Sequence, residues 1–322
     1  MRALVTGGAG FIGSHLSEAL LKKKHEVYVV DNLSTGSIKN IKRLKKRKAF
    51  HFHIDDIMNE KIMKRLIKKV DVIFHLAAAV GVKYILDNPL ESIRTNVKGT
   101  EVILEFANSL GKKKVFLAST SEIYGKNQDG AASFKETDDR LLGSTTKWRW
   151  SYSCTKALDE FLALAYHREK ELPVTIARFF NTCGPRQSGR YGMVIPRLIK
   201  QALMNKPLTV YGDGKQTRCF LYVDDAVNAI LGLVEKKKAL GEIFNIGNPR
   251  SISILDLAEK IKKFTGSSSK IEFVPYEKAY EKGFEDMRHR KPDISKIKAL
   301  LKFSPKVDMD ELLKRTVTYF QK

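Results

Sequence analysis

ALVTGGAGFIGSHL (residues 3–16) is the most informative stretch of the chain. A short apolar run at residues 3–6 is followed at once by closely spaced glycines and then by a helix-forming segment. Strand, glycine turn and helix in this order let the backbone approach a pyrophosphate, whose charge is favoured at a helix N-terminus. The stretch therefore predicts a dinucleotide site at Gly7, Gly10, Phe11, Ile12 and Gly13.

The next predicted strand supports this site. It covers residues 26–30 and leads into Asp31, whose carboxylate would accept hydrogen bonds from the ribose hydroxyls of an adenosine. The same charge would repel a 2′-phosphate, and no Lys or Arg lies between Asp31 and Ile38. The pattern therefore favours NAD over NADP. A glycine-rich turn in a domain that binds no cofactor is the alternative.

Short apolar or β-branched runs alternate with longer amphipathic segments through the first half of the chain. The runs lie at residues 3–6, 26–30, 71–75, 115–119 and 174–178, and the longest amphipathic segments at 89–110 and 151–170. Strands that are buried on both faces and alternate with helices predict an α/β fold with a Rossmann-type, doubly wound parallel sheet. We expect this domain at residues 1–180, rejoined by about 222–247, and a smaller substrate-binding domain at 181–322.

Composition narrows the class of protein. The 322 residues are 43% apolar and carry 58 Lys and Arg against 36 Asp and Glu, a net charge of +22. This is the composition of a folded globular protein. Three cysteines without C-x-x-C spacing, and a His51 and His53 pair without a third ligand, predict no metal site. Without a long apolar span or a signal-peptide pattern, we expect a cytoplasmic protein that does not bind membranes.

A Tyr-x-x-x-Lys pattern indicates chemistry. Tyr152 and Lys156 share a face of the predicted helix, and the ammonium is expected to lower the pKa of the phenol from about 10 toward neutrality. Tyr152 could then act as a general base. The stretch ASTSEIYG (residues 118–125) adds Thr120, Ser121 and Glu122 at the C-terminal edge of a strand, where open parallel sheets bind ligands. A helix-surface pair is the alternative for Tyr152 and Lys156.

A series of motifs now extends along the whole chain. They are TGGAGFIGSHL (6–16), DNLSTG (31–36), HLAA (75–78), NVKGT (96–100), ASTSEIYG (118–125), YSCTK (152–156), RFFNTCGPR (178–186), LTVYGDGKQTRCFLYVDD (208–225) and RKPD (290–293). In this order they resemble the extended short-chain dehydrogenase/reductases that modify nucleotide sugars. The set is specific for the family and much less so for the reaction.

The resemblance implies roles for individual residues. Thr120, Tyr152 and Lys156 match the catalytic set, with Ser121 and Glu122 beside them. NAD would be bound by Gly7, Gly10, Phe11, Ile12, Gly13, Asp31, Asn32, Asp56, Ile57, Leu76, Ala77, Ala78, Asn96, Tyr152 and Lys156. The nucleotide sugar would be bound by Thr120, Asn181, Val194, Tyr211, Arg218, Arg288 and Arg290. A solvated basic surface is the alternative for the arginines, most of all for Arg288.

Family members of this kind first oxidise the sugar at C4, and the 4-ketone then opens three reactions. Decarboxylation follows readily for a uronate, because the 4-ketone makes it a β-keto acid. Thr120-Ser121-Glu122, GDGKQTR and RKPD resemble UDP-glucuronate decarboxylases, so we predict a UDP-xylose-forming decarboxylase. A UDP-glucose or UDP-glucuronate 4-epimerase is the alternative. A 4,6-dehydratase is disfavoured, since those enzymes have Thr-Asp-Glu there, and Glu122 could instead be a structural acid.

A nucleic-acid-binding protein with this fold is the alternative from another class, because the chain is strongly basic. The basic run at residues 42–48 has no interleaved aromatic residues on which bases could stack. A binding protein would also have no need of Thr120, Tyr152 and Lys156. We therefore expect a UDP-sugar substrate and no nucleic acid. By resemblance, a homodimer is expected to form through the helices at 89–110 and 151–170.

Overall fold

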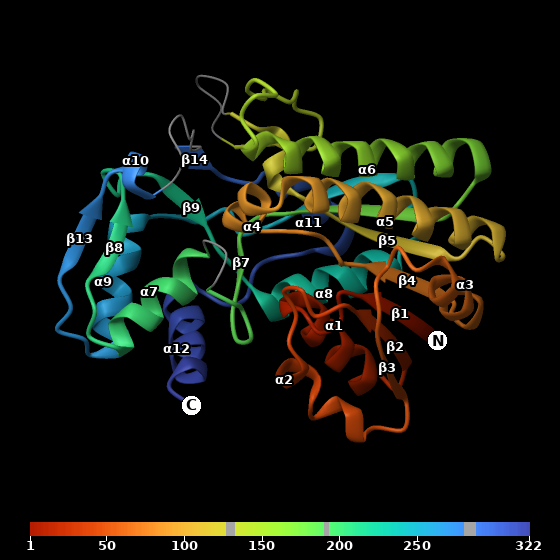
Figure 1. The fold of residues 1–322 in the computed structure, drawn as a ribbon, viewed down its shortest axis with the longest axis horizontal. Coiled ribbons are helices and arrows are strands. Elements are labelled where there is room, and N and C mark those ends of the chain that lie inside the picture. Colours follow the sequence, from red (N-terminus) through yellow and green to blue (C-terminus); the bar gives the residue numbers. More distant parts are fainter. Residues whose placement is uncertain (127–132, 190–192, 280–287) are drawn as a thin grey trace.

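The fold is built on one parallel sheet. A computed structural model describes residues 1–126, 133–189, 193–279 and 288–322, and its largest sheet has seven strands in the order β11-β6-β5-β4-β1-β2-β3 (Figure 1). The strands are β1 (Arg2–Thr6), β2 (Glu26–Asp31), β3 (Phe50–Ile54), β4 (Val72–His75), β5 (Lys114–Thr120), β6 (Val174–Phe179) and β11 (Glu242–Ile246). The predicted doubly wound parallel α/β sheet is confirmed.

The order of the strands places a crevice at the centre of the sheet. From β1 the chain builds β2 and β3 on one side, and β4, β5 and β6 on the other. The reversal lies between β1 and β4, which pair in parallel with Thr6 opposite His75. Connections leave this point in opposite directions, so the carboxyl ends of the two strands border an open groove.

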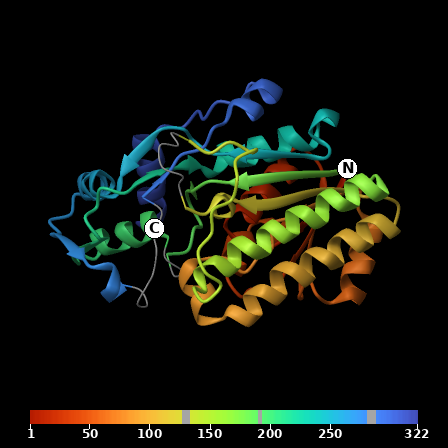
Figure 2. The ribbon, with the colours of Figure 1, turned by 90° about the horizontal axis from the view of Figure 1, so that it is seen from above.

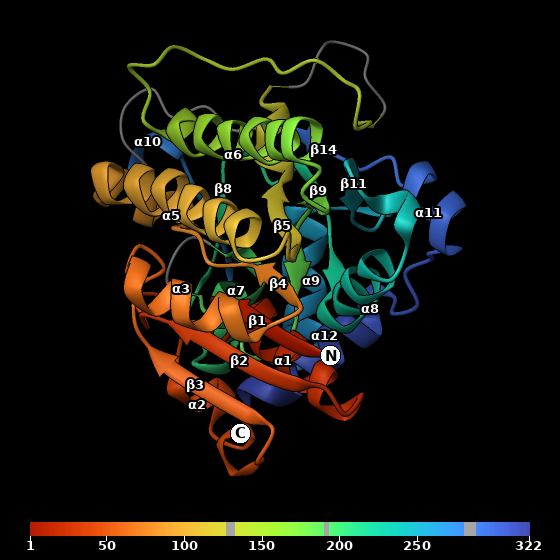
Figure 3. The ribbon, with the colours of Figure 1, turned by 90° about the vertical axis from the view of Figure 1, so that its right-hand side faces the viewer.

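Helices cover both faces of the sheet. On one face α3 (Glu60–Lys69), α5 (Pro89–Ser109) and α6 (Arg149–Lys170) pack together, and on the other lie α1 (Phe11–Lys22) and α8 (Val223–Val234) (Figures 2 and 3). Each presents an apolar stripe to the sheet, as Leu16 and Leu20 of α1 and Leu104 of α5 illustrate. Within the described ranges, no helix is both long and apolar enough to cross a membrane.

A smaller region extends from one end of the sheet. Its helices are α7 (Val194–Leu203), α9 (Ile254–Thr265) and α12 (Met309–Phe320). Its strands are β8 (Leu208–Tyr211), β9 (Thr217–Cys219), β12 (Ser251–Ser253), β13 (Ile271–Val274) and β14 (His289–Arg290). Because β11 returns from this half of the chain to pair with β6, the two regions are interleaved (Figure 1).

Short elements complete the chain. They are α2 (Ile38–Ile41), η1 (Leu44–Lys46), α4 (Val82–Asp87), η2 (Ser121–Tyr124), β7 (Thr182–Cys183), β10 (Leu221–Tyr222), η3 (Lys237–Ala239), α10 (Tyr276–Ala279) and α11 (Ser295–Leu301). Among them η2 matters most for the site, because it continues directly from β5. It turns the chain at the carboxyl edge of the sheet.

A buried ion pair fixes α6 against the sheet. Arg178 of β6 donates from Nη2 to Oε2 of Glu160 on α6 over 2.8 Å, and both side chains are buried. Ser119 of β5 donates to the other carboxylate oxygen over 2.5 Å, and Arg178 also donates to the carbonyl of Glu136. The pair therefore joins two neighbouring strands, one loop and the helix that carries Tyr152.

Replacing Arg178 should show how strongly the fold depends on this pair. Arg178→Met leaves the Glu160 charge buried without its partner, which should lower the free energy of unfolding by about 3–5 kcal/mol. Chemical denaturation measures the change. Adding Glu160→Gln should recover part of the loss, whereas Lys112→Met, in the exposed pair with Glu171, should cost under about 1 kcal/mol. An Arg178→Met protein as stable as the parent would contradict this account.

Candidate active site

One large cavity of about 540 Å³ lies at the carboxyl edge of the sheet and runs into the smaller region. Many of the residues predicted to bind cofactor or substrate line it. They are Gly7, Gly10, Phe11, Ile12, Gly13, Asp31, Asn32, Ile57, Leu76, Ala77, Ala78, Thr120, Ser121, Glu122, Tyr152, Asn181, Val194, Tyr211, Arg218 and Arg290. Residues that are far apart in the sequence therefore line one cavity.

Four predicted residues do not line this cavity. Lys156 and Asn96 are buried behind its wall, while Asp56 accepts a hydrogen bond from Asn32 over 2.8 Å. Arg288 is exposed and pairs with Asp213. Lys156 and Asn96 can act on the site only through other groups. Roles for Asp56 and Arg288 in binding stay predictions.

The glycine turn leaves room for a pyrophosphate. Gly7 has φ of +68°, and a Cβ there would lie 2.9 Å from the backbone nitrogen of Ala77. A Cβ on Gly13 would lie 2.2 Å from the carbonyl oxygen of Gly7. Gly10 is the N-cap of α1 and has no side chain that could accept hydrogen bonds from the start of the helix. The first backbone N–H groups of α1 therefore stay available to a ligand, and they border the cavity. The turn therefore fits the pyrophosphate of a dinucleotide.

Asp31 ends β2 at the wall of the same cavity. Its carboxylate accepts hydrogen bonds from the backbone N–H of Ala9 over 2.9 Å and of Leu33 over 2.8 Å. Burial raises the pKa of Asp31, and these backbone donors oppose that effect. The backbone thus holds the carboxylate beside the glycine turn, in the place where a ribose would lie. Its contact with adenosine ribose stays a prediction.

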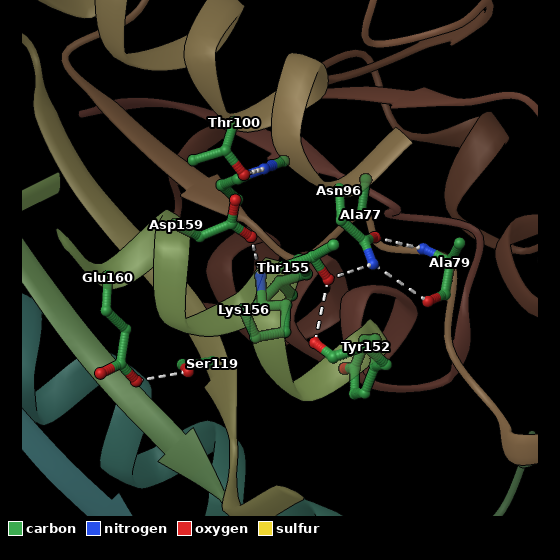
Figure 4. Close-up of polar contacts among 12 residues, drawn as sticks. Ala77, Ala79, Asn96, Thr100, Ser119, Tyr152, Thr155, Lys156, Asp159 and Glu160 are labelled. Atoms are coloured by element: carbon green, nitrogen blue, oxygen red, sulfur yellow. Dashed lines mark hydrogen bonds and ion pairs between the residues drawn. The ribbon is translucent and has the colours of Figure 1, made fainter. Parts of the chain in front are cut away.

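The loop after β4 forms the next part of the wall. Thr6 accepts hydrogen bonds from the backbone N–H groups of Leu76 and Ala77, and Asn96 accepts one from Ala79 over 2.8 Å. Asn96 therefore positions the loop from behind (Figure 4). The loop's backbone lies close to Gly7, and its contact with the nicotinamide ribose stays a prediction.

Thr120 and Tyr152 meet at the floor of the cavity. Thr120 ends β5 and accepts a hydrogen bond from the backbone N–H of Glu122, so it caps η2. Tyr152 lies in the first turn of α6, and the Thr120 side chain is near enough to its phenol to favour a lower pKa of that phenol. These two hydroxyls can therefore hold one substrate oxygen between them.

The expected lowering of the tyrosine pKa is wrong for this structure. Burial raises the pKa of Tyr152 above its ordinary value, the charges of Glu122 and Asp159 raise it further, and only the Thr120 side chain opposes them. Burial is the main reason, and in addition Lys156 does not act as an unopposed cation. Its Nζ donates to Oδ2 of Asp159 over 2.7 Å, and both side chains are buried (Figure 4).

Glu122 lies between two guanidinium groups. Arg290 donates to one carboxylate oxygen, and Nη2 of Arg149 lies 3.4 Å from the other. Burial by itself would raise the pKa of Glu122, but the charges of Arg290 and then Arg149 outweigh it and lower the pKa to about 2. Glu122 is therefore an anion at neutral pH, held between two guanidinium groups.

The outer end of the cavity carries further cations and an aromatic ring. Arg290 also donates to Asn181 over 2.7 Å, and Arg218 is buried in β9. The guanidinium carbon of Arg197 lies 4.4 Å from the centre of the Tyr211 ring. Val194 is the first residue of α7 and lines the cavity. Cations and a planar ring suit a diphosphate and a nucleotide base, which is the role predicted for this end.

Three residues here were missed by the reading of the sequence. Arg149 and Asp159 each lie three positions from a predicted catalytic residue, Tyr152 and Lys156 respectively, on the same helix. That spacing puts side chains on one face, so the sequence contained the signal. Arg197 packs on Tyr211 from another element, and no local pattern indicates that contact.

The comparisons with known proteins agree with one another. A family model described as GDP-mannose 4,6 dehydratase matches residues 4–316. UDP-N-acetyl-alpha-D-glucosaminuronate decarboxylase of Bacillus cytotoxicus is 48% identical over 321 residues, 99% of this chain and 98% of that protein. UDP-glucuronic acid decarboxylase 1 of Arabidopsis thaliana is 38% identical over 321 residues, 100% of this chain and 70% of that protein.

A solved structure of a related enzyme has a closely similar fold. The UDP-glucuronic acid 4-epimerase from Bacillus cereus, in complex with UDP-glucuronic acid and NAD, gives a TM-score of 0.89 at 34% identity. The alignment covers 100% of this chain and 99% of that one. Its cofactor is the one favoured here by Asp31.

The Glu122 cluster should make stability depend on pH. The pKa of Glu122 is about 2 in the folded protein and about 4.3 in an unfolded chain. Its contribution should therefore be complete above about pH 5 and fall as the pH drops toward 2. Glu122→Gln should be less stable than the parent by about 2 kcal/mol at neutral pH, and this gap should close in acid.

Chemical denaturation at a series of pH values measures that gap. Glu171→Gln, which removes a charge from an exposed ion pair, is the matched control and should leave stability nearly unchanged. A gap between Glu122→Gln and the parent that stays constant from pH 7 to about pH 2 would contradict the role of the ionised carboxylate.

Proposed function

Because the chain belongs to the GDP-mannose 4,6-dehydratase family, whose members here are NAD-dependent sugar-nucleotide enzymes of the extended short-chain dehydrogenase/reductases, we propose that it decarboxylates a UDP-hexuronate. The family and the cofactor predicted from the sequence are thereby confirmed. Its relatives include both decarboxylases and 4-epimerases of UDP-sugars.

The cluster around Glu122 supports this reaction best. Arg149 and Arg290 both contact Glu122, so two guanidinium groups line the end of the cavity next to Tyr152. A neutral C6 hydroxyl would gain little there, whereas the C6 carboxylate of a uronate would be attracted by both guanidinium groups. The arrangement therefore favours an acidic sugar over a neutral one.

The residues divide the chemistry between them. Thr120 and Tyr152 would hold the C4 hydroxyl, and Tyr152 would take its proton. Bound NAD supplies the hydride acceptor at C4 and later returns the hydride. When the C5–C6 bond breaks and CO₂ leaves, its electron pair moves onto the C4 oxygen, which Thr120 and Tyr152 stabilise by hydrogen bonds. A proton from water must then reach C5, because Glu122 is ionised at neutral pH and has no proton to give.

Two UDP-hexuronates are candidate substrates. The relative with 48% identity is named for UDP-N-acetylglucosaminuronate, and the relative with 38% identity for UDP-glucuronate. The greater similarity favours the N-acetylated substrate, with UDP-glucuronate second. Both share the C4 hydroxyl and the C6 carboxylate on which the proposal rests, and they differ only at C2.

A 4-epimerase remains the second candidate. The solved UDP-glucuronic acid 4-epimerase matches the whole fold, and it also takes a UDP-uronate. An epimerase must keep the carboxylate attached while the 4-ketone rotates. The two reactions therefore share Tyr152 and the acid-binding cluster, and only the products distinguish them.

Product analysis tests the proposal. The protein with NAD should release CO₂ and form a UDP-pentose derivative from UDP-N-acetylglucosaminuronate, from UDP-glucuronate, or from both at different rates. Tyr152→Phe lacks the base and should reduce the rate by at least about 100-fold with its fold intact. Quantitative formation of the C4 epimer without gas would replace decarboxylation by epimerisation. No turnover of either uronate would reject both.

We also propose that the protein is a homodimer through α5 and α6, as its resemblance to the family implies. Apolar side chains project from this pair of helices, with Phe161 66%, Leu158 50% and Leu90 62% exposed. α5 and α6 lie side by side along one flank of the molecule (Figure 2). Two copies of that flank could cover each other's apolar residues in one four-helix interface.

Light scattering tests the dimer. The parent protein should have twice the mass of the chain, and Phe161→Glu should be a monomer because it places two charges in an apolar interface. Glu169→Gln, near the end of the same helix, serves as the control. A monomeric parent at micromolar concentration would contradict the proposal.

A further inference from the structure

Asp159 is the partner of the buried lysine in the active site. The carboxylate lies one helical turn beyond Lys156 on α6, and the two side chains are only 1% and 2% exposed. Figure 4 shows Asp159 pointing from α6 to the Lys156 ammonium, on the side away from Tyr152. The lysine that was predicted to act on the tyrosine is thus neutralised from behind.

Stability does not explain a carboxylate at this position. Taking both ions out of water costs free energy that their attraction only partly offsets, and an apolar side chain of similar volume is often as stable. In addition, Oδ1 of Asp159 is buried and has no hydrogen-bond partner within the described residues. A half-satisfied buried carboxylate is costly, which indicates a functional reason for it.

No other described group replaces Asp159 as the counterion of Lys156. His75 of β4 is buried, and burial together with the Lys156 charge lowers its pKa to about 3, so it is neutral at physiological pH. Its ring is hydrogen-bonded to Thr6 and Thr100. From η2, Glu122 is paired with Arg290 and Arg149; from β6, Arg178 is paired with Glu160.

The charge of Asp159 also reaches Tyr152. Burial is the largest cause that raises the pKa of Tyr152, and the charges of Glu122 and Asp159 follow in that order. Glu122 has its own cations, whereas Asp159 has Lys156. The carboxylate therefore opposes the effect that a cation four residues after a tyrosine would otherwise have on the phenol.

We propose that Asp159 is a positioning residue, which fixes the Lys156 ammonium below the cavity and offsets the influence of that ammonium on Tyr152. The base then becomes active at a higher pH than it would with an unpaired lysine. The inference rests on the proposed function only in taking Tyr152 as the base at C4. It says nothing about which sugar is bound.

Asp159→Asn tests the inference, since it keeps the shape of the side chain and removes its charge. The Tyr152 phenolate is titrated by ultraviolet difference absorbance in the NAD-loaded protein, with Tyr152→Phe as the blank. The acid limb of kcat/KM against pH is recorded alongside. Both midpoints should move to lower pH by about one unit, because loss of a nearby negative charge favours the phenolate.

Three further variants make the test decisive. Asp159→Glu keeps the charge and should restore the parent midpoint, while Glu171→Gln removes an exposed charge elsewhere and should leave it unmoved. If Asp159→Asn does not fold, Asp159→Leu serves with the same expected shift. Midpoints that do not move, or that move to higher pH, overturn the inference. If neither uronate is turned over, the proposed function fails, but the absorbance titration still decides the role of Asp159.

Discussion

The ion pair between Glu160 and Arg178 is the interaction on which the active site depends. It holds α6 at a fixed height over the carboxyl ends of β5 and β6, with Ser119 as a third partner. Tyr152 and Lys156 both lie on that helix, while Thr120 lies on β5. A small shift of the helix along the sheet would separate the phenol from the Thr120 hydroxyl, and the two could no longer hold one substrate oxygen.

The charged groups near the chemistry are paired with groups of opposite charge, on other elements for Glu160 and Glu122 and on the same helix for Lys156. Glu160 is paired with Arg178, Lys156 with Asp159, and Glu122 with two arginines. The first two pairs are buried and nearly neutral overall, so they fix geometry. The third faces the cavity and presents two guanidinium groups to it. Guanidinium groups that can attract an anion therefore line the cavity both beside Glu122 and at its outer end, where Arg218 lies.

The sequence predicts those features that arise from local order along the chain. Gly7 and Gly13, the carboxylate at the end of β2 and the helical spacing of Tyr152 and Lys156 all lie within single strand–turn–helix units. Five of the seven strands of the central sheet, β1, β2, β4, β5 and β6, were predicted for the same reason, within one residue at their ends. The rest of the site was predicted only from the resemblance of its motifs to a family. Arg290 and Glu122, for example, are 168 residues apart, and only the fold brings them together. The pKa of Tyr152 was predicted in the wrong direction, because it depends on burial and on a counterion to Lys156 that the motif does not include.

The net charge of +22 and the cations of the site attract anions in different ways. Exposed charges act over roughly 8 Å at physiological ionic strength, so scattered surface lysines add a general attraction for anions and little selectivity. Selectivity requires cations that are partly desolvated and held in place, and Arg149, Arg290 and Arg218 are such groups. If surface charge controlled binding, raising the salt concentration would weaken UDP-uronates and neutral UDP-sugars about equally, since both carry the diphosphate. Because the C6 carboxylate would instead meet buried guanidinium groups, the preference for the uronate should persist at high salt even as both affinities decline.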